Sequence, residues 1–154
     1  MKQLSIALFL SLFCMLCACT EQTQVVQIVA TDCQKYVELN YSNYDSLKTD
    51  QLNVQAVNIE GDCLVLTLQY GGGCKEHQVD LALIQPQCGT PPLPPPTFEI
   101  RHDSNDDSCE ALITKDYSFD ISGIREQGKT KTDFILAVKN SLGEISSTTY
   151  TYNY

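Results

Sequence analysis

Residues 64–83 read LVLTLQYGGGCKEHQVDLAL, and this stretch decides the expected fold. Apolar side chains take every second position from Leu64 to Tyr70 and again from Val79 to Leu83. Strict alternation on both sides of a glycine-rich turn predicts a β-hairpin with one face on a hydrophobic core. His77 is in phase with the second apolar set, so its side chain is expected to begin the inward face of that strand.

The remaining sequence supplies more short strands and no long periodic helix. Runs of β-branched and aromatic residues bounded by turn residues predict strands at 25–30, 36–39, 54–59, 97–102, 111–114, 117–121, 134–138 and 145–154. All 6 prolines lie in residues 86–96, which are therefore expected to form a stiff crossover between two sheets. These features predict an all-β fold, a single-domain antiparallel β-sandwich over residues 25–154, with the immunoglobulin topology as one candidate.

The first residues have the pattern of an export signal. Lys2 is followed by an apolar run, Leu4–Leu16, which is shorter than the about 20 residues of a membrane span. Residues 16–19, Leu-Cys-Ala-Cys, resemble the lipobox of bacterial lipoproteins, whose last cysteine is lipidated. We therefore expect a lipoprotein signal peptide at 1–18, a covalent lipid with palmitate among its chains on Cys19, and a polar tether at 19–24. A plain signal peptide with incidental cysteines is the alternative.

Location and charge limit the partners. Thr20 stands where an aspartate would signal retention at the inner membrane, so we expect the outer membrane, on its periplasmic or surface face. The chain has 19 acidic and 10 basic residues, a formal net charge of −9. Such a surface repels phosphate backbones, which argues against nucleic acid as a partner. The expected partners are the membrane, through the lipid, and an envelope protein or a small ligand.

Five cysteines, an odd number, follow the tether. They are Cys33, Cys63, Cys74, Cys88 and Cys109. Because the compartment beyond the inner membrane is oxidising, all five are disulfide candidates, and at most two bridges can form within one chain. Cys63 with Cys88 is one candidate pair, and Cys33 with Cys63 or with Cys88 are the others.

The two histidines each stand near a cysteine, as Cys74-x-x-His77 and His102-x6-Cys109. His102 shares the expected inward face of its strand with Phe98 and Ile100, and Glu99 and Arg101 are on the other face. We favour a Cys74–Cys109 disulfide, with each histidine bonded to a loop carbonyl or carboxylate. The alternative is a zinc or copper site, or a thiol-redox site, made of these two cysteines and two histidines.

Other chemistry has weaker signals. Asp103, Asn105 and Asp107 alternate in a turn as calcium ligands do, but the glycine and closing glutamate of an EF-hand loop are missing, so we read an ordinary acidic turn. The sequence has no recognisable catalytic motif. We therefore expect no enzymatic activity and no cofactor besides the lipid on Cys19.

Three short motifs lie in roughly the second half of the expected mature chain, between residues 70 and 122. They are Tyr70-x-Gly72-Gly73-Cys74-x-x-His77, His102-x-x-Asn105-Asp106-x-x-Cys109 and Tyr117-x-Phe119-Asp120-x-Ser122. Together they resemble a family of small uncharacterised lipoproteins of Gram-negative bacteria. The resemblance implies that Cys74 and Cys109 act as a unit, and it brings no activity with it. The function expected from the sequence is a lipid-anchored binding or structural module of the cell envelope.

Overall fold

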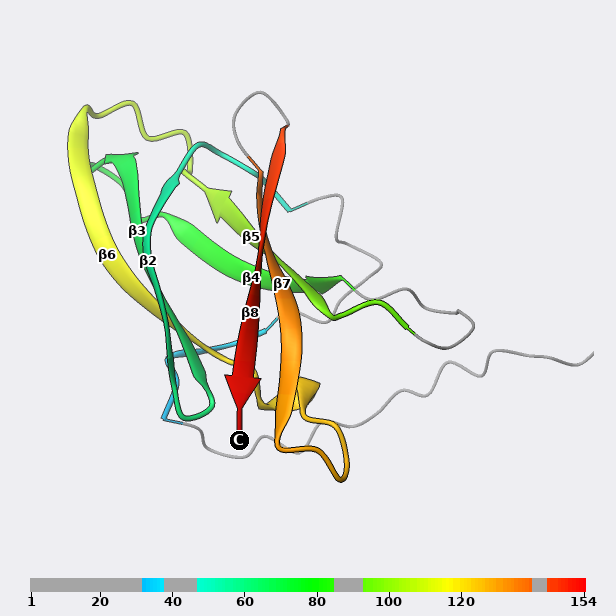
Figure 1. Ribbon diagram of the computed structural model, residues 1–154. Coiled ribbons are helices and arrows are strands. Elements are labelled where there is room, and N and C mark those ends of the chain that lie inside the picture. Colours follow the sequence, from blue (N-terminus) through cyan, green and yellow to red (C-terminus); the bar gives the residue numbers. More distant parts are fainter. Residues whose placement is uncertain (1–31, 38–46, 85–92, 140–143) are drawn as a thin grey trace, which may run out of the picture. The chain divides into compact units, whose positions relative to one another are not determined.

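The computed structural model of the protein describes residues 32–37, 47–84, 93–139 and 144–154. In these ranges the strands are β1 (Lys35–Tyr36), β2 (Asn53–Glu60), β3 (Cys63–Gly72), β4 (Gln78–Ile84), β5 (Thr97–Asp103), β6 (Ala111–Asp120), β7 (Lys131–Lys139) and β8 (Ile145–Asn153), with a 3-10 turn η2 at Ser122–Ile124. They form two four-stranded sheets, ordered β1-β6-β3-β2 and β4-β5-β7-β8 (Figure 1). The predicted all-β sandwich is confirmed. None of the described helices is long and apolar enough to cross a membrane.

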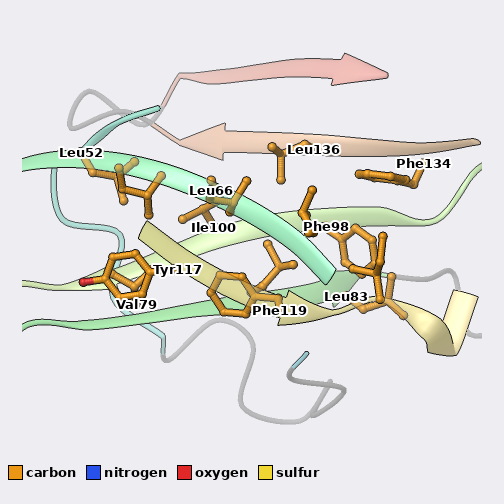
Figure 2. Close-up of a cluster of buried hydrophobic side chains, with 14 of the residues drawn as sticks. Leu52, Leu66, Val79, Leu83, Phe98, Ile100, Tyr117, Phe119, Phe134 and Leu136 are labelled. Carbon is orange, nitrogen blue, oxygen red and sulfur yellow. The ribbon is translucent and has the colours of Figure 1, made fainter. Parts of the chain in front are cut away.

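The core lies between the two sheets and is made by the alternating apolar residues (Figure 2). Leu64, Leu66 and Leu68 of β3 face it from the first sheet and are 0% exposed. From the second sheet the core receives, among others, Val79, Leu81, Phe98, Phe134 and Tyr152. Because every second residue of β3 and β4 is apolar from Leu64 to Tyr70 and from Val79 to Leu83, each of these strands can bury one face, and the hydrophobic effect packs the two sheets together.

The predicted hairpin between β3 and β4 is wrong. β3 pairs with β2 and β6 in one sheet, and β4 pairs with β5 in the other. The glycine stretch therefore carries the chain from one sheet to the other across an end of the sandwich. The physical reason is that alternation reports which face of a strand is buried, and both strands of a crossover have one face on the same core.

The prediction that the sandwich is antiparallel throughout is wrong. β1 pairs in parallel with β6, and β5 pairs in parallel with β7. β5 and β7 run the same way because β6, which lies between them in sequence, belongs to the opposite sheet. The chain thus leaves the second sheet and returns to it in the same direction.

One predicted outward face is buried. Glu99 and Arg101 of β5 are 3% and 5% exposed, and they form an ion pair at 3.0 Å. β7 pairs with β5 only as far as Ile100, and beyond it residues 48–50 run along the free side of β5. Arg101 donates to the carbonyl of Leu47 at 3.1 Å, so the segment before β2 lies against this part of the strand.

Several predictions fall outside the described residues. They concern the signal peptide and Cys19, the tether, the strand at 25–30, most of the proline-rich crossover and Cys88. Of the strand predicted at 36–39, the described part pairs as β1, Lys35–Tyr36. Cys33, just before β1, forms a disulfide with Cys63 at the start of β3.

A polar cluster fastens the end of β8 to the opposite sheet. Arg125 forms an ion pair with Asp62, in the β2–β3 turn, and its Nε donates to the hydroxyl of Tyr152 at 2.9 Å. That hydroxyl also donates to Asp62. Burial, and then the bond to Asp62, raise the pKa of Tyr152 to about 12, so the hydroxyl stays a donor at physiological pH.

Candidate functional site

Two crossovers run side by side at the end of the sandwich opposite the Arg125 cluster. Residues 73–77 connect β3 to β4, and residues 104–110 connect β5 to β6. They lie together because β3 pairs with β6 and β4 with β5, with Gly72 opposite Ala111 and Gln78 opposite Asp103. We call these two segments the paired loops.

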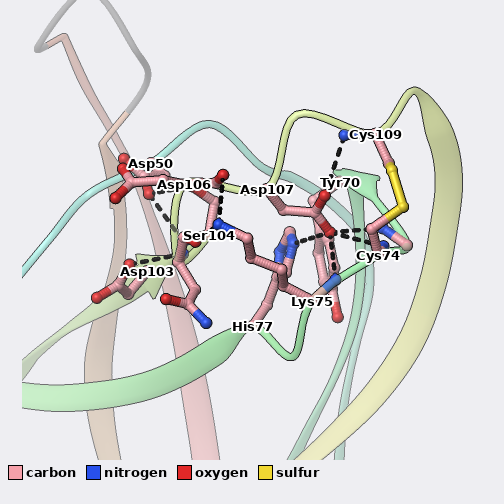
Figure 3. Close-up of polar contacts among 12 residues, drawn as sticks. Asp50, Tyr70, Cys74, Lys75, His77, Asp103, Ser104, Asp106, Asp107 and Cys109 are labelled. Carbon is pink, nitrogen blue, oxygen red and sulfur yellow. Dashed lines mark hydrogen bonds and ion pairs between the residues drawn. A yellow bond between two sulfur atoms is a disulfide. The ribbon is translucent and has the colours of Figure 1, made fainter.

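A disulfide joins the paired loops covalently (Figure 3). It links Cys74 to Cys109, whose Cα atoms are 5.9 Å apart. The four cysteines of the described residues are therefore paired as Cys74–Cys109 and Cys33–Cys63.

Asp107 holds the first of the paired loops from inside the second. Its Oδ2 accepts the backbone N–H groups of Gly73, Cys74 and Lys75 at 2.9, 2.9 and 2.8 Å, and its Oδ1 accepts that of Cys109 at 3.0 Å. The side chain is 1% exposed. These backbone donors, Cys109 and Lys75 first, hold the pKa of Asp107 far below the usual range of a carboxyl, so it remains an anion.

Lys75 closes the paired loops from the other direction. Its ammonium donates to the carbonyls of Asn105 and Asp106, each at 2.9 Å. Both residues have positive φ, 54° and 51°. Asn and Asp tolerate this left-handed conformation better than most residues do, and the tight turn directs their carbonyls at the lysine.

Both histidines are buried beneath the paired loops and contact each other. His77 Nδ1 lies 2.9 Å from His102 Nε2, and the His77 side chain is 2% exposed. Tyr70 stacks on the His77 ring with centroids 4.7 Å apart, and its hydroxyl is 2.6 Å from that of Tyr117. Burial, followed by the bond to Tyr70, raises the pKa of Tyr117, so the Tyr117 hydroxyl stays neutral.

The four ring nitrogens form a row whose ends both meet acceptors. At one end His77 Nε2 lies 3.3 Å from Asp107 Oδ2, and at the other His102 Nδ1 lies 3.2 Å from the carbonyl oxygen of Asp50. Each end therefore needs an N–H, and the contact between the rings needs one more. Three N–H groups among the four ring nitrogens would satisfy all three of these contacts.

Burial lowers the pKa of His102, which is 2% exposed, and so favours its neutral form with the proton on Nδ1. His77 is the ring beside the anionic Asp107.

This geometry determines what the predicted metal ligands can do. The sulfur atoms of Cys74 and Cys109 are bonded to each other, and the ring nitrogens are directed at each other and at Asp107. Cys74, Cys109 and Asp107 also lie close enough to share a metal ion, within 4.8 Å. Both the predicted ligand set with two histidines and the set with Asp107 need the thiolates of Cys74 and Cys109, which become available only if the disulfide is reduced.

The sequence did not reveal the role of Asp107. Asp107 read as one residue of an acidic turn, yet its carboxylate organises both loops. A local signal did exist: an aspartate whose side chain accepts the N–H two residues later forms an Asx-turn, and Cys109 occupies that position. The bonds to residues 73–75 have no local signal, because they join segments more than 30 residues apart.

Known proteins share this fold. The family described as the NigD-like C-terminal beta sandwich domain matches residues 35–152. No curated protein matches the chain.

Three solved structures are similar in fold. One, from Parabacteroides distasonis and related to toxins by its description, is 22% identical with a TM-score of 0.61, over 77% of this chain and 60% of that one. A protein of unknown function from Bacteroides vulgatus is 17% identical with a TM-score of 0.60, over 79% of this chain and 57% of that one. A NigD-like immunity protein from Bacteroides caccae is 15% identical with a TM-score of 0.58, over 77% of this chain and 62% of that one. The chain thus spans less than two thirds of the length of each.

Proposed function

Because this chain belongs to the family of NigD-like C-terminal beta sandwich domains, we propose that it is a lipid-anchored protein of the cell envelope that binds a partner protein. In this proposal the lipid on Cys19 holds the protein at the membrane. The β-sandwich presents the paired loops to the partner, and catalysis has no part.

The observation that carries the proposal is the rigidity of the paired loops. Cys74, Lys75, Glu76, Asn105 and Asp106 are exposed, so a partner can reach them. The same loops are held by the disulfide, by the four bonds of Asp107 and by the two bonds of Lys75. Because the loops are already ordered, binding would cost little conformational entropy. Loops on a rigid β scaffold are a common place for recognition.

Charge supports a basic partner. Glu76, Asp106 and Glu110 are exposed on or beside the paired loops. The one lysine there directs its ammonium at two carbonyls, and the whole chain has a formal charge of −9. A positively charged protein surface would be complementary, and attraction between the two would speed the encounter.

Site-specific photo-crosslinking in living cells tests the loop surface. A photoreactive residue at Asn105 should give an adduct, and the same residue at exposed Gln55 on β2 should not give that adduct. The double substitution Cys74→Ala/Cys109→Ala should weaken the Asn105 adduct. An identical adduct from both positions, or none from Asn105, would exclude the paired loops as the binding surface.

Fractionation tests the anchor separately. Cys19→Ala should move the protein from the membrane to the soluble fraction and abolish labelling by radioactive palmitate, with Cys17→Ala as the matched control that keeps both. A protein that stays in the membrane without Cys19 would disprove the lipid anchor.

The printed names of two solved structures, one related to toxins and one an immunity protein, support a narrower form of the proposal. Here the partner is a protein toxin that reaches the cell envelope. A strain lacking the gene should be more sensitive to toxin-containing medium of competing strains, and wild type should restore resistance better than Cys19→Ala. Equal sensitivity with and without the gene would reject this form.

The second candidate function, a zinc, copper or thiol-redox site, is favoured by one observation: one ligand atom each of Cys74, Cys109 and Asp107 lie within 4.8 Å of one another. It requires the reduced state. Intact mass without reductant, thiol counting and elemental analysis separate the two candidates. Two protected thiols that a chelator exposes while releasing metal would favour the metal site, and two bridges without stoichiometric metal would favour the binding module.

A further inference from the structure

β8 is an edge strand with a free row of backbone groups. Among the described residues it pairs only with β7, in one continuous antiparallel register from Lys139↔Ile145 to Lys131↔Asn153. The N–H of Tyr154 donates to the carbonyl of Thr130 at 2.9 Å, which identifies this pair as a hydrogen-bonded one. In an antiparallel ladder such pairs alternate, so the even residues of β8 bond to β7. The N–H and C=O groups of the odd residues, 145 to 153, therefore point away from the sheet.

The other sheet edges carry protection that β8 lacks. β2 has an irregularity between Val54 and Ala56, and it ends in Glu60. At β4 the ammonium of Lys35 donates to the carbonyl of Val79 and lies beside Asp80. At the edge formed by β1 the strand is only two residues long, and the stretch of β6 that has no further partner there among the described residues, 111–118, carries Lys115 and Asp116. Bulges, charges and short strands are the devices that keep edges from pairing.

The sequence of β8, ISSTTYTYN, contains none of these devices. It has no charge, proline or glycine over nine residues, in a chain of formal charge −9. Its inner face is held in place, since Tyr150 stacks on Phe134 and Tyr152 is 0% exposed. The outer edge is therefore a straight, neutral template in a fixed position.

We propose that β8 is the surface through which two copies of this chain associate. The two strands pair antiparallel about a two-fold axis at Thr149, and the two four-stranded sheets become one of eight strands. This register pairs every outward residue with another: 149 with 149, 147 with 151, and 145 with 153. The strand is thus complementary to itself, which a two-fold interface requires. Because β8 has no charged side chain, the pairing brings no like charges of the two strands together, although each chain has a formal net charge of −9.

The register predicts a specific cross-link. Hydrogen-bonded antiparallel pairs have Cα atoms about 5.5 Å apart, which suits a disulfide. Thr149→Cys, in a Cys88→Ser background in whole cells, should therefore form a disulfide-linked dimer. Two differently tagged copies should both appear in it. Gln55→Cys, exposed on β2, measures cross-linking by random collision.

Charges at 147 and 151 test whether the pairing is the proposed one. Ser147→Lys/Thr151→Lys places like charges opposite each other twice, and should lower the Thr149→Cys dimer fraction by about threefold to tenfold. Ser147→Glu/Thr151→Lys places opposite charges there and should keep or raise it. Both variants carry the same lysine opposite Asp133 of β7, so effects within one copy are matched.

The possible results decide the question. A dimer that contains both tags, exceeds the Gln55→Cys control and follows the charge series supports the pairing. The proposal is overturned if no dimer forms, if the adduct contains another protein, or if both charge variants behave alike.

Discussion

Gly72 is the residue on which the packing beneath the paired loops depends most directly. Its φ is 147°, and a Cβ atom there would lie 2.5 Å from His77 Nε2 and 3.0 Å from Asp107 Oδ2. The absence of a side chain therefore makes room for the contact between His77 and Asp107. The contact between His77 and Asp107 thus requires that residue 72 has no side chain.

We predict that Gly72→Ala lowers the free energy of unfolding by about 1–3 kcal/mol, the usual cost of overpacking a buried site. Gly71→Ala is the matched control, because a Cβ there meets nothing within 4 Å. Urea denaturation of both variants measures the difference. Equal stability of the two variants would show that the space around Gly72 is not limiting.

The histidine pair makes stability depend on pH. The folded pKa of His102 is lowered from 6.5 by burial, so the unfolded chain binds more protons than the folded chain between the lowered value and 6.5. The contribution of His102 to the free energy of unfolding should therefore be complete above about pH 6.5. The free energy of unfolding should decrease as the pH falls below 6.5. Urea titrations between pH 7.5 and pH 5 measure this, with His102→Gln expected to have a flatter profile.

The pH dependence of stability in His102→Gln shows whether His102 causes the effect. The pKa of Asp107 and that of Asp50 are lowered too, but carboxyls with lowered pKa lose their contribution only below the ordinary value of 3.8. They do not explain a change between pH 5 and pH 6.5. An unchanged slope in His102→Gln would therefore assign the effect to a different group.

At the scale of elements, the paired loops differ from an ordinary pair of turns because each connects the two sheets. One disulfide across them resists separation of the sheets at that end, and Cys33–Cys63 attaches the segment before β1 to β3. The two bridges close segments of similar length, with sequence separations of 35 and 30. Their entropic contributions should thus be similar, while their local effects differ.

We predict that Cys74→Ala/Cys109→Ala and Cys33→Ala/Cys63→Ala each lower the free energy of unfolding by roughly 3–4 kcal/mol. Amide hydrogen exchange should separate them, because only the first pair holds the loop whose N–H groups bond to Asp107. Exchange at residues 73–75 should accelerate in the first variant and not in the second. Equal acceleration in both would mean that the disulfide does not order the paired loops.

At the scale of the whole molecule, cysteine pairing has a countable consequence. Two bridges use four of the five cysteines beyond the tether, and in the proposed lipoprotein the thiol of Cys19 carries the lipid. We predict one alkylatable thiol per mature chain under denaturing, non-reducing conditions, and none in Cys88→Ser. Intact mass after iodoacetamide measures this. A count of two in the wild type would indicate that Cys19 is not lipidated, and a count of three that one bridge is missing.

The sequence by itself determined which apolar faces of β3 and β4 are buried and what kind of fold they make. Alternation from Leu64 to Tyr70 and from Val79 to Leu83 reports the buried face of a strand, since the side-chain period of two is a local property of the backbone. It also predicted that His77 and His102 point inward, and the structure buries both.

Only the tertiary structure decided which strands are neighbours and what the buried histidines contact. A crossover and a hairpin have the same alternation, so the partners of β3 and β4 depended on how both sheets pack. The four bonds of Asp107, the contact between the two histidine rings and the free edge of β8 likewise depend on segments distant in sequence. Local patterns cannot report such contacts, because their energies exist only once the segments have met.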